Sequence, residues 1–197
     1  MNIFYLSEDP VEAARMHCDK HVVKMILETA QLLSTTHRIL DGKEIKSIRT
    51  MKNGKKRAHK SWVHSDKHMN EHLYSASHVN HPCAIWLRES PANYDWTYQL
   101  FLALCEQYTL RYGKMHLSQL KLVDVIDKAP RKYKDRSLPF TQPPQAMPDV
   151  YKVKGDSVSA YRAYYIGDKV AFAKWAKIPN SEPEWWLAAF KEPEETT

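Results

Sequence analysis

The sequence predicts an all-α fold, a compact single-domain helical bundle with a short extended segment at its N-terminus and a long proline-rich loop. Two long stretches, residues 9–40 and 90–113, carry apolar side chains at helical spacing. Each begins with a residue that can cap a helix, followed directly by proline, and each ends beside a glycine. Only residues 3–6 resemble a strand. The chain of 197 residues is long enough for one large domain, and no internal repeat divides it.

Turn and capping signals divide the rest of the chain. Asn53-Gly54 is a turn signal and predicts a basic loop or hairpin rather than a helix. The prolines between residues 139 and 148 remove backbone donors and fix φ, which excludes a regular helix or a central strand there. We therefore expect, in order, a basic loop at 42–60, helices at 61–77, 83–89, 90–113 and 117–128, a proline-rich loop at 129–155, a helix at 156–176 and a short helix from 181.

Composition excludes several classes of protein. No run approaches the ~18–20 apolar residues that span a bilayer, and the N-terminal residues do not resemble a signal peptide. The cysteines, Cys18, Cys83 and Cys105, are isolated, odd in number and without CxxC spacing, which argues against a disulfide framework and a thiolate zinc site. We expect an intracellular protein in the cytoplasm, which is that of the bacterial host if the chain is encoded by a phage.

A polar stripe on the first long helix is the leading candidate site. At about 100° per residue, one narrow face of an otherwise apolar helix collects six polar side chains, those of His17, His21, Lys24, Glu28, Gln31 and Thr35. Such groups on a largely buried helix are expected to face a cleft or to satisfy one another. The ordinary alternative is an ion pair between Lys24 and Glu28 beside two histidines with satisfied rings.

The stripe has the groups for chemistry on a sugar or a base. Glu28 can stabilise an oxocarbenium-like sugar or activate water, and His17 or His21 can transfer a proton near neutral pH. Lys24 can neutralise a phosphate or act as an imine-forming amine. A base has to leave the stack to be reached, and aromatic side chains are its natural receivers.

The positive charge of the chain is clustered. The formal net charge is +6, and residues 43–60 hold eight lysines and arginines against one acid. A second basic run covers residues 128–136, and lysines, arginine and tyrosines alternate in residues 151–165. Such clusters attract a polyanion, although they also occur as solvated loops and core tyrosines. Our candidate nucleic-acid-binding residues are Lys20, Lys55, Lys56, Arg57, Lys152, Lys154, Tyr161 and Arg162.

The ten histidines do not form a metal motif. His64, His68 and His72 follow one another on one face of the predicted helix 61–77. They do not match HExxH, and three histidines over two turns of a straight helix cannot all reach one ion. His78 and His81 can join them in space, but no sequence pattern indicates it. We expect no metal and no cofactor.

Three segments, HCDKHVVKMILETAQLLSTTHRILDG, HPCAIWLRES and MPDVYKVKGDSVSAYRAYY, look like a set of small phage-encoded proteins with no settled activity. The layout of the chain also resembles the pyrimidine-dimer DNA glycosylases of the T-even phage type. That resemblance implies a compact, basic, all-helical protein. It also implies an N-terminal amine that attacks the sugar carbon to form an imine, with help from a glutamate on the first helix and from arginines that hold phosphates.

This chain departs from that pattern at the glutamate. Lys20 and His21 stand at the equivalent depth, so His21 occupies the place of the carboxylate, and Glu28 is the nearest acid on the stripe. Asn2 disfavours removal of the initiator methionine, so an amine nucleophile would belong to Met1.

We therefore predict an enzyme that resembles a DNA glycosylase or abasic lyase, acting on double- or single-stranded DNA and not on membranes. Its candidate catalytic residues are Met1, His17, His21, Lys24 and Glu28. The alternatives are a phage enzyme that modifies a DNA base or a nucleotide, and a non-catalytic protein that binds DNA or a host component.

Overall fold

The computed structural model of the chain describes residues 1–191. Its regular elements follow one another as α1 (Pro10–Met16), α2 (Asp19–Asp41), β1 (Gly42–Thr50), β2 (Lys56–His64), α3 (Lys67–His72), α4 (Pro82–Leu87), α5 (Pro91–Tyr112), α6 (Leu117–Leu122), the 3₁₀ turn Asp149–Tyr151, α7 (Ser157–Asp168) and α8 (Glu184–Ala189). No helix among these residues is long and apolar enough to cross a membrane.

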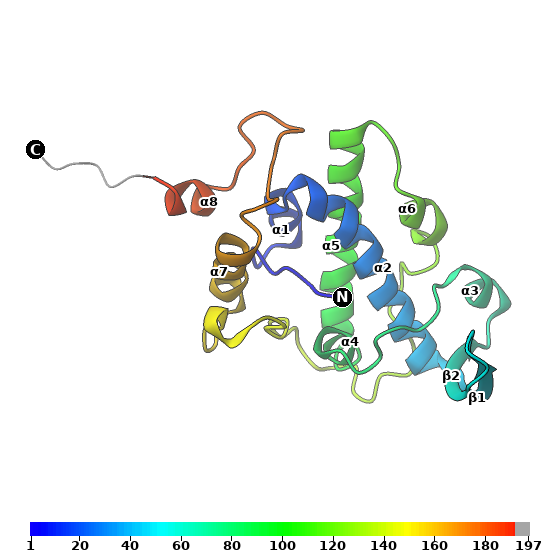
Figure 1. The fold of residues 1–197 in the computed structure, drawn as a ribbon. Helices are drawn as coiled ribbons and strands as arrows, with labels where there is room; N and C mark the ends of the chain where they lie inside the picture. The colour runs from blue at the N-terminus through cyan, green and yellow to red at the C-terminus, as the bar shows by residue number, and fades with distance from the viewer. Residues whose placement is uncertain (192–197) are drawn as a thin grey trace, which may run out of the picture.

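Helices α2 and α5 form the centre of the molecule. They pack against each other, and α1 packs beside them on α5 (Figure 1). Figure 1 shows α7 and α8 on one side of this pair and α3, α6 and the β1–β2 hairpin on the other. The N-terminal segment runs inward between the two sides, and its residues Ile3–Leu6 are buried in the core. The start of the chain therefore lies beside the middle of α2 rather than at the periphery.

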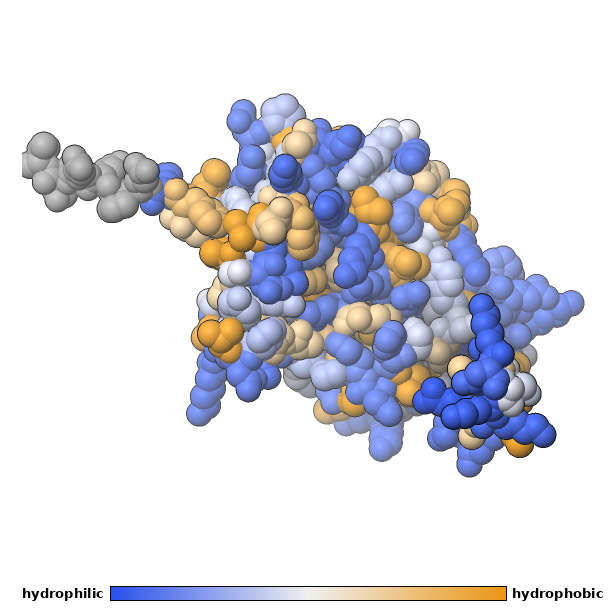
Figure 2. All heavy atoms as spheres, viewed as in Figure 1, coloured by the Kyte–Doolittle hydropathy of each residue, from blue (hydrophilic) through white to orange (hydrophobic). Residues whose placement is uncertain are grey.

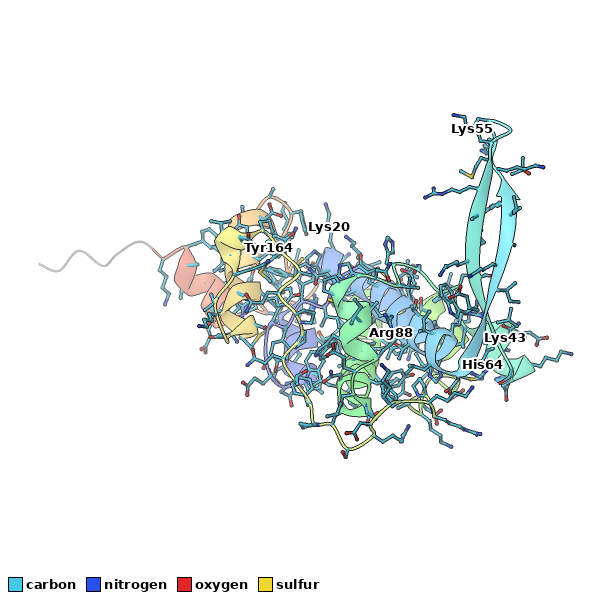
Figure 3. The ribbon with its side chains drawn as sticks, turned by 90° about the horizontal axis from the view of Figure 1, so that it is seen from below. Lys20, Lys43, Lys55, His64, Arg88 and Tyr164 are labelled. Atoms are coloured by element: carbon cyan, nitrogen blue, oxygen red, sulfur yellow. The ribbon has the colours of Figure 1, made fainter. Side chains whose placement is uncertain are left out.

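The prediction of an all-α fold is wrong, because residues 42–64 form an antiparallel hairpin. Its two nine-residue strands pair from Gly42 opposite His64 to Thr50 opposite Lys56. Gly54 takes φ +76° in the turn, a conformation that glycine adopts without strain. The strands lack the alternating apolar face by which a strand is recognised, because the hairpin projects from the body and most of its side chains are exposed (Figure 3). The helix expected at 61–77 is reduced to α3.

The helix expected from residue 9 to 40 is interrupted at His17 and Cys18. Both residues are extended, with ψ 135° and 163°, and they separate α1 from α2. The buried Arg111 of α5 stabilises this break, because its guanidinium donates to the carbonyls of Arg15 and His17 at 3.1 and 2.8 Å. It also forms an ion pair with Asp19 at 3.1 Å. A charged group that binds unpaired carbonyls at a helix end offsets the backbone bonds lost there.

Helices α5 and α7 begin at the predicted capping residues. Ser90 accepts from the amide of Ala92 at the start of α5, and Asp156 accepts from Ser159 at the start of α7. Gly113 ends α5 with φ +67°. The predicted short last helix is α8. The proline-rich segment has no regular structure apart from the 3₁₀ turn, as expected.

Candidate active site and nucleic-acid interface

His17 and His21 are enclosed in an aromatic core. The two side chains are 0% and 4% exposed. His17 Nδ1 lies 2.6 Å from the carbonyl oxygen of Ala13, and His21 Nδ1 lies 2.6 Å from the hydroxyl of Tyr165. The ring of Phe4 packs on His21 with centroids 4.5 Å apart. Burial lowers the pKa of His17 to about 4 and that of His21 to about 3. Both rings are therefore neutral near pH 7.

Met1, Lys24 and Glu28 meet at the middle of α2. The amino group of Met1 lies 4.0 Å from Glu28 Oε2, and Lys24 Nζ lies 3.4 Å from Oε1 of the same carboxylate. The Glu28 side chain is 14% exposed, whereas that of Lys24 is 65% exposed. The structure thus brings together three of the five predicted catalytic residues and separates His17 and His21 from them.

Asn2 holds the start of the chain in place. Its backbone amide donates to Glu28 Oε2 at 2.8 Å, and its side-chain amide donates to the carbonyl of Ala146 in the proline-rich loop at 2.9 Å. The hydroxyl of Tyr161 donates to Asn2 Oδ1 at 2.7 Å. Sequence reasoning missed Asn2 as a site residue, because its role depends on contacts with residues 144 and 159 positions away.

The segment that joins α3 to α4 borders the amine. Ser77 Oγ lies 3.9 Å from the Met1 sulfur and its amide donates to Thr35 on α2. Burial lowers the pKa of His81, and the positive charge of the N-terminal amine lowers it further. Arg88 donates to the carbonyl of Val79 at 2.7 Å and so fixes this segment to α4. The NHP sequence around His81 was the only signal for a site here.

Cys83 and Tyr161 contact the Asn2 side chain as neutral groups. Burial raises the pKa of Cys83 to about 11 and that of Tyr161 well above its usual value. A thiol of that kind is a poor nucleophile near neutral pH. The reactive groups of this site are therefore the amines of Met1 and Lys24 and the carboxylate of Glu28.

The hairpin presents an exposed cationic surface, which the basic run at residues 43–60 forms. Lys55 stands at the tip, and Lys43 and His64 lie at the root (Figure 3). Lys55, Lys56 and Arg57 are exposed, and Figure 2 shows hydrophilic side chains over this part of the surface. In Figure 3 the hairpin extends toward the same side of the body on which Lys20 and Tyr164 lie. A long polyanion on that side can therefore contact both the hairpin and the start of α2.

The register of the hairpin places like charges opposite each other. Lys46 pairs with Lys60, and Arg49 pairs with Arg57. Only Lys60 is compensated among them within the described residues, by Glu44 at 3.1 Å. Like charges directly across an antiparallel pair of strands destabilise the pairing. An isolated two-stranded hairpin is also only marginally stable in water, so a bound anion would relieve a real repulsion.

The predicted contact residues around α7 have different environments. Lys152 and Lys154 are exposed, and Lys152 pairs with Asp149 at 2.7 Å. Tyr161 is 0% exposed, so a base cannot stack on it. Arg162 donates to the carbonyl of Leu6 at 2.9 Å, which makes it a half-buried brace of the N-terminal segment.

Comparisons with models of protein families, with curated proteins and with solved structures return no match to this chain.

Proposed function

We propose that this protein is a DNA-acting enzyme of the glycosylase or abasic-lyase type, in which the Met1 amine is the nucleophile and Glu28 handles the proton. One observation carries the proposal. The amino group of Met1 lies 4.0 Å from a carboxylate that is 14% exposed, at the end of a segment fixed by Asn2. The resemblance to T-even-phage-type pyrimidine-dimer glycosylases supports the same pairing, with Glu28 in place of the expected earlier carboxylate.

The chemistry follows from the groups present. The neutral amine forms a bond to C1′ of an abasic or glycosylic sugar, and water or the base leaves with a proton. Loss of a proton from C2′ then expels the 3′-phosphate, and water releases the amine from the imine. Glu28 can accept the proton from the attacking amine and return it to the leaving group. α-Amino groups at chain termini are in general weaker bases than lysine side chains, so a larger fraction of such groups is neutral near pH 7.

Lys24 has two possible parts in this reaction. Its exposed ammonium, 3.4 Å from Glu28, can bind a phosphate of the substrate strand. It is also the alternative amine, because it contacts the other oxygen of the same carboxylate. His17 and His21 have no part in the proposed reaction, because both are buried and engaged on the core side of α2.

Borohydride trapping on a panel of oligonucleotides tests the proposal. The panel carries abasic sites, uracil, hydroxymethylated pyrimidines and thymine dimers, in duplex and single strands. Untagged or C-terminally tagged protein is used, and its intact mass establishes that Met1 has a free amine. We expect a covalent adduct on one substrate, which peptide mapping assigns to Met1. An adduct on Lys24 would transfer the role to that residue, whereas no adduct and no strand scission would overturn the lyase proposal.

Matched variants separate catalysis from folding. Glu28→Gln removes the carboxylate and keeps its shape, and Glu106→Gln makes the same change on the exposed side of α5. We expect Glu28→Gln to lose the adduct with DNA binding retained, and Glu106→Gln to behave like the parent. Equal loss in both variants would contradict the assignment.

The hairpin favours a second candidate, a non-catalytic protein that binds DNA. A two-stranded antiparallel ribbon fits the major groove of B-DNA, and this one is basic and exposed. Binding of duplex DNA by a chain that yields no adduct and no modified base would support this candidate. A changed base mass without an adduct would instead support a base-modifying enzyme.

A further inference from the structure

Three potential metal ligands meet where the hairpin leaves α2. His37 and Asp41 are one turn apart at the end of α2, and His64 ends β2 opposite Gly42. One ligand atom from each of the three lies within 4.8 Å of the other two. This cluster is separate from the amine site and does not depend on the proposed function. It lines a hollow of about 390 Å³ that also includes Asp124, Asp127 and Lys128 among its walls.

The hydrogen bonds of His37 leave one ring nitrogen free for a ligand. Tyr94 donates its hydroxyl proton to the carbonyl of Ile126 at 2.8 Å. His37 Nε2, 2.7 Å from the same hydroxyl oxygen, is then the donor in that contact. Nδ1 therefore has an unshared lone pair, and among residues 1–191 it has no hydrogen-bond partner, although the side chain is 3% exposed. A histidine whose second nitrogen is fixed by a hydrogen bond is typical of metal sites.

His64 presents a second buried nitrogen without a partner. Its Nε2 has no hydrogen-bond partner in the part of the chain that the structure describes, and the residue is 9% exposed. Nδ1 accepts from the amide of Asp66 at 3.1 Å, which puts the proton of the neutral ring on Nε2. Binding a metal through Nε2 moves that proton to Nδ1 and breaks this contact. The competing arrangement is a hydrogen bond from His64 Nε2 to His37 Nδ1, direct or through water.

Asp41 is held in a fixed orientation. Its two carboxylate oxygens accept from the backbone amides of Arg131 and Lys132 at 2.9 and 3.0 Å. Each oxygen keeps a second lone pair for a metal. A carboxylate that is oriented by outer hydrogen bonds is again what metal sites require.

We propose that His37, Asp41 and His64 bind one divalent transition-metal ion, with Zn²⁺ as the best fit. Two imidazole nitrogens and one carboxylate oxygen suit Zn²⁺, whereas Mg²⁺ and Ca²⁺ prefer oxygen ligands. Three protein ligands leave a fourth position open to the hollow, an arrangement found in catalytic zinc sites. With bonds of about 2.0–2.1 Å, ligand atoms in a tetrahedral site lie about 3.4 Å apart, which is compatible with ligand atoms that lie within 4.8 Å of one another.

The metal would fix the hairpin to the body. Arg38 already links this root to the body, because it donates to the carbonyls of Trp62 and Tyr74 at 2.9 and 2.6 Å. A bond from an ion to both α2 and His64 adds a second link at the same place. The expected consequence is slower cleavage of the lysine- and arginine-rich hairpin by trypsin when the metal is bound.

Metal titration of the full-length, tag-free protein tests the proposal. EDTA-treated protein is titrated with Zn²⁺ by calorimetry and with Co²⁺ by visible absorption, and bound metal is counted by mass spectrometry. We expect one ion per chain, a tetrahedral Co²⁺ spectrum and slower tryptic cleavage of the hairpin. His37→Gln and His64→Gln should each weaken binding about 100-fold, and Tyr94→Phe about 10-fold through His37.

Two control variants exclude a surface site. His59→Gln changes an exposed hairpin histidine, and His68→Gln removes the exposed member of a histidine pair on α3 whose rings lie 4.2 Å apart. Both should bind the metal as the parent does. Loss of binding in His68→Gln but not in His37→Gln would overturn the proposal, as would absence of stoichiometric binding by folded parent protein. Circular dichroism of each variant establishes that it is folded.

Discussion

Two histidine pairs at opposite ends of α2 show how surroundings decide the use of the same side chain. His17 and His21 are packed against Phe4 and Tyr165, whereas His37 and His64 line a hollow beside Asp41. Burial lowers the pKa of His17 and of His37 to about 4, so burial and pKa do not distinguish these two histidines. The difference is the oriented carboxylate beside the second pair. A depressed histidine pKa alone is therefore a poor guide to a functional site.

The largest expected effect is on adduct formation, and it tests whether His17 and His21 take no part in the proposed reaction. Glu28→Gln should lower single-turnover adduct formation by about 100-fold or more, because it removes the proton-handling group. His21→Gln should change the rate of adduct formation by less than about threefold, because this substitution alters only the packing of the core. Both rates are measured at saturating DNA, well below the melting temperature of each variant. A comparable loss of rate in His21→Gln would contradict this contrast and would show that His21 takes part in the reaction.

The next effect is on stability. His21→Ala should lower the free energy of unfolding by about 2–4 kcal/mol, because it leaves a cavity and removes the partner of Tyr165. His59→Ala, an exposed change in the hairpin, should cost less than about 0.5 kcal/mol. Urea unfolding in EDTA measures both values. Equal costs would show that the aromatic core does not depend on His21.

A pH series sharpens the contrast further. His17 and His21 have folded-state pKa values of about 4 and 3, below the usual 6.5. At a pH between the folded-state value and 6.5, each histidine is therefore protonated in the unfolded chain and neutral in the folded chain. Their contribution to stability is complete above pH 6.5 and is lost as the pH falls. Each should account for about 1–2 kcal/mol between pH 6.5 and 5. The slope of unfolding free energy against pH should decrease in His21→Gln, and an unchanged slope would contradict the assignment.

The smallest expected effect is on DNA binding, and it compares exposed basic side chains with one that is hydrogen-bonded to the protein. Replacing Lys55, Lys56 and Arg57 by glutamine should weaken DNA binding about tenfold at low salt and reduce its dependence on salt, because fewer counterions are released. Arg162→Gln should leave the salt dependence unchanged, because Arg162 binds the carbonyl of Leu6. Fluorescence anisotropy at several salt concentrations measures both. A reduced slope in Arg162→Gln alone would place the DNA on α7 instead.

The long helices could be predicted because their signals are local. Ser90-Pro91 and Gly113 bound α5, and Asp156 caps α7, without help from distant residues. The break before α2 could not be predicted in this way, since Arg111 stabilises it from another helix. The sequence left both a loop and a hairpin open for residues 42–60, because a hairpin that buries little has strands without an apolar period.

The same distinction applies to the sites. Lys24 and Glu28 were found because they are four residues apart on one helix, and Met1 through a family resemblance. Asn2 and the grouping of His37 with His64 depend on contacts across the fold. His17 and His21 fell on the polar stripe by spacing, but the interruption of the helix and the packing of α7 direct them into the core.

The like-charge pairs of the hairpin make its order sensitive to ions in two opposite ways. Added salt screens Lys46 from Lys60 and Arg49 from Arg57, so it should tighten the unbound ribbon. The same salt competes with phosphates for these side chains and loosens the complex. If the ribbon binds DNA as proposed, added salt should therefore make the free ribbon more ordered and make the complex weaker.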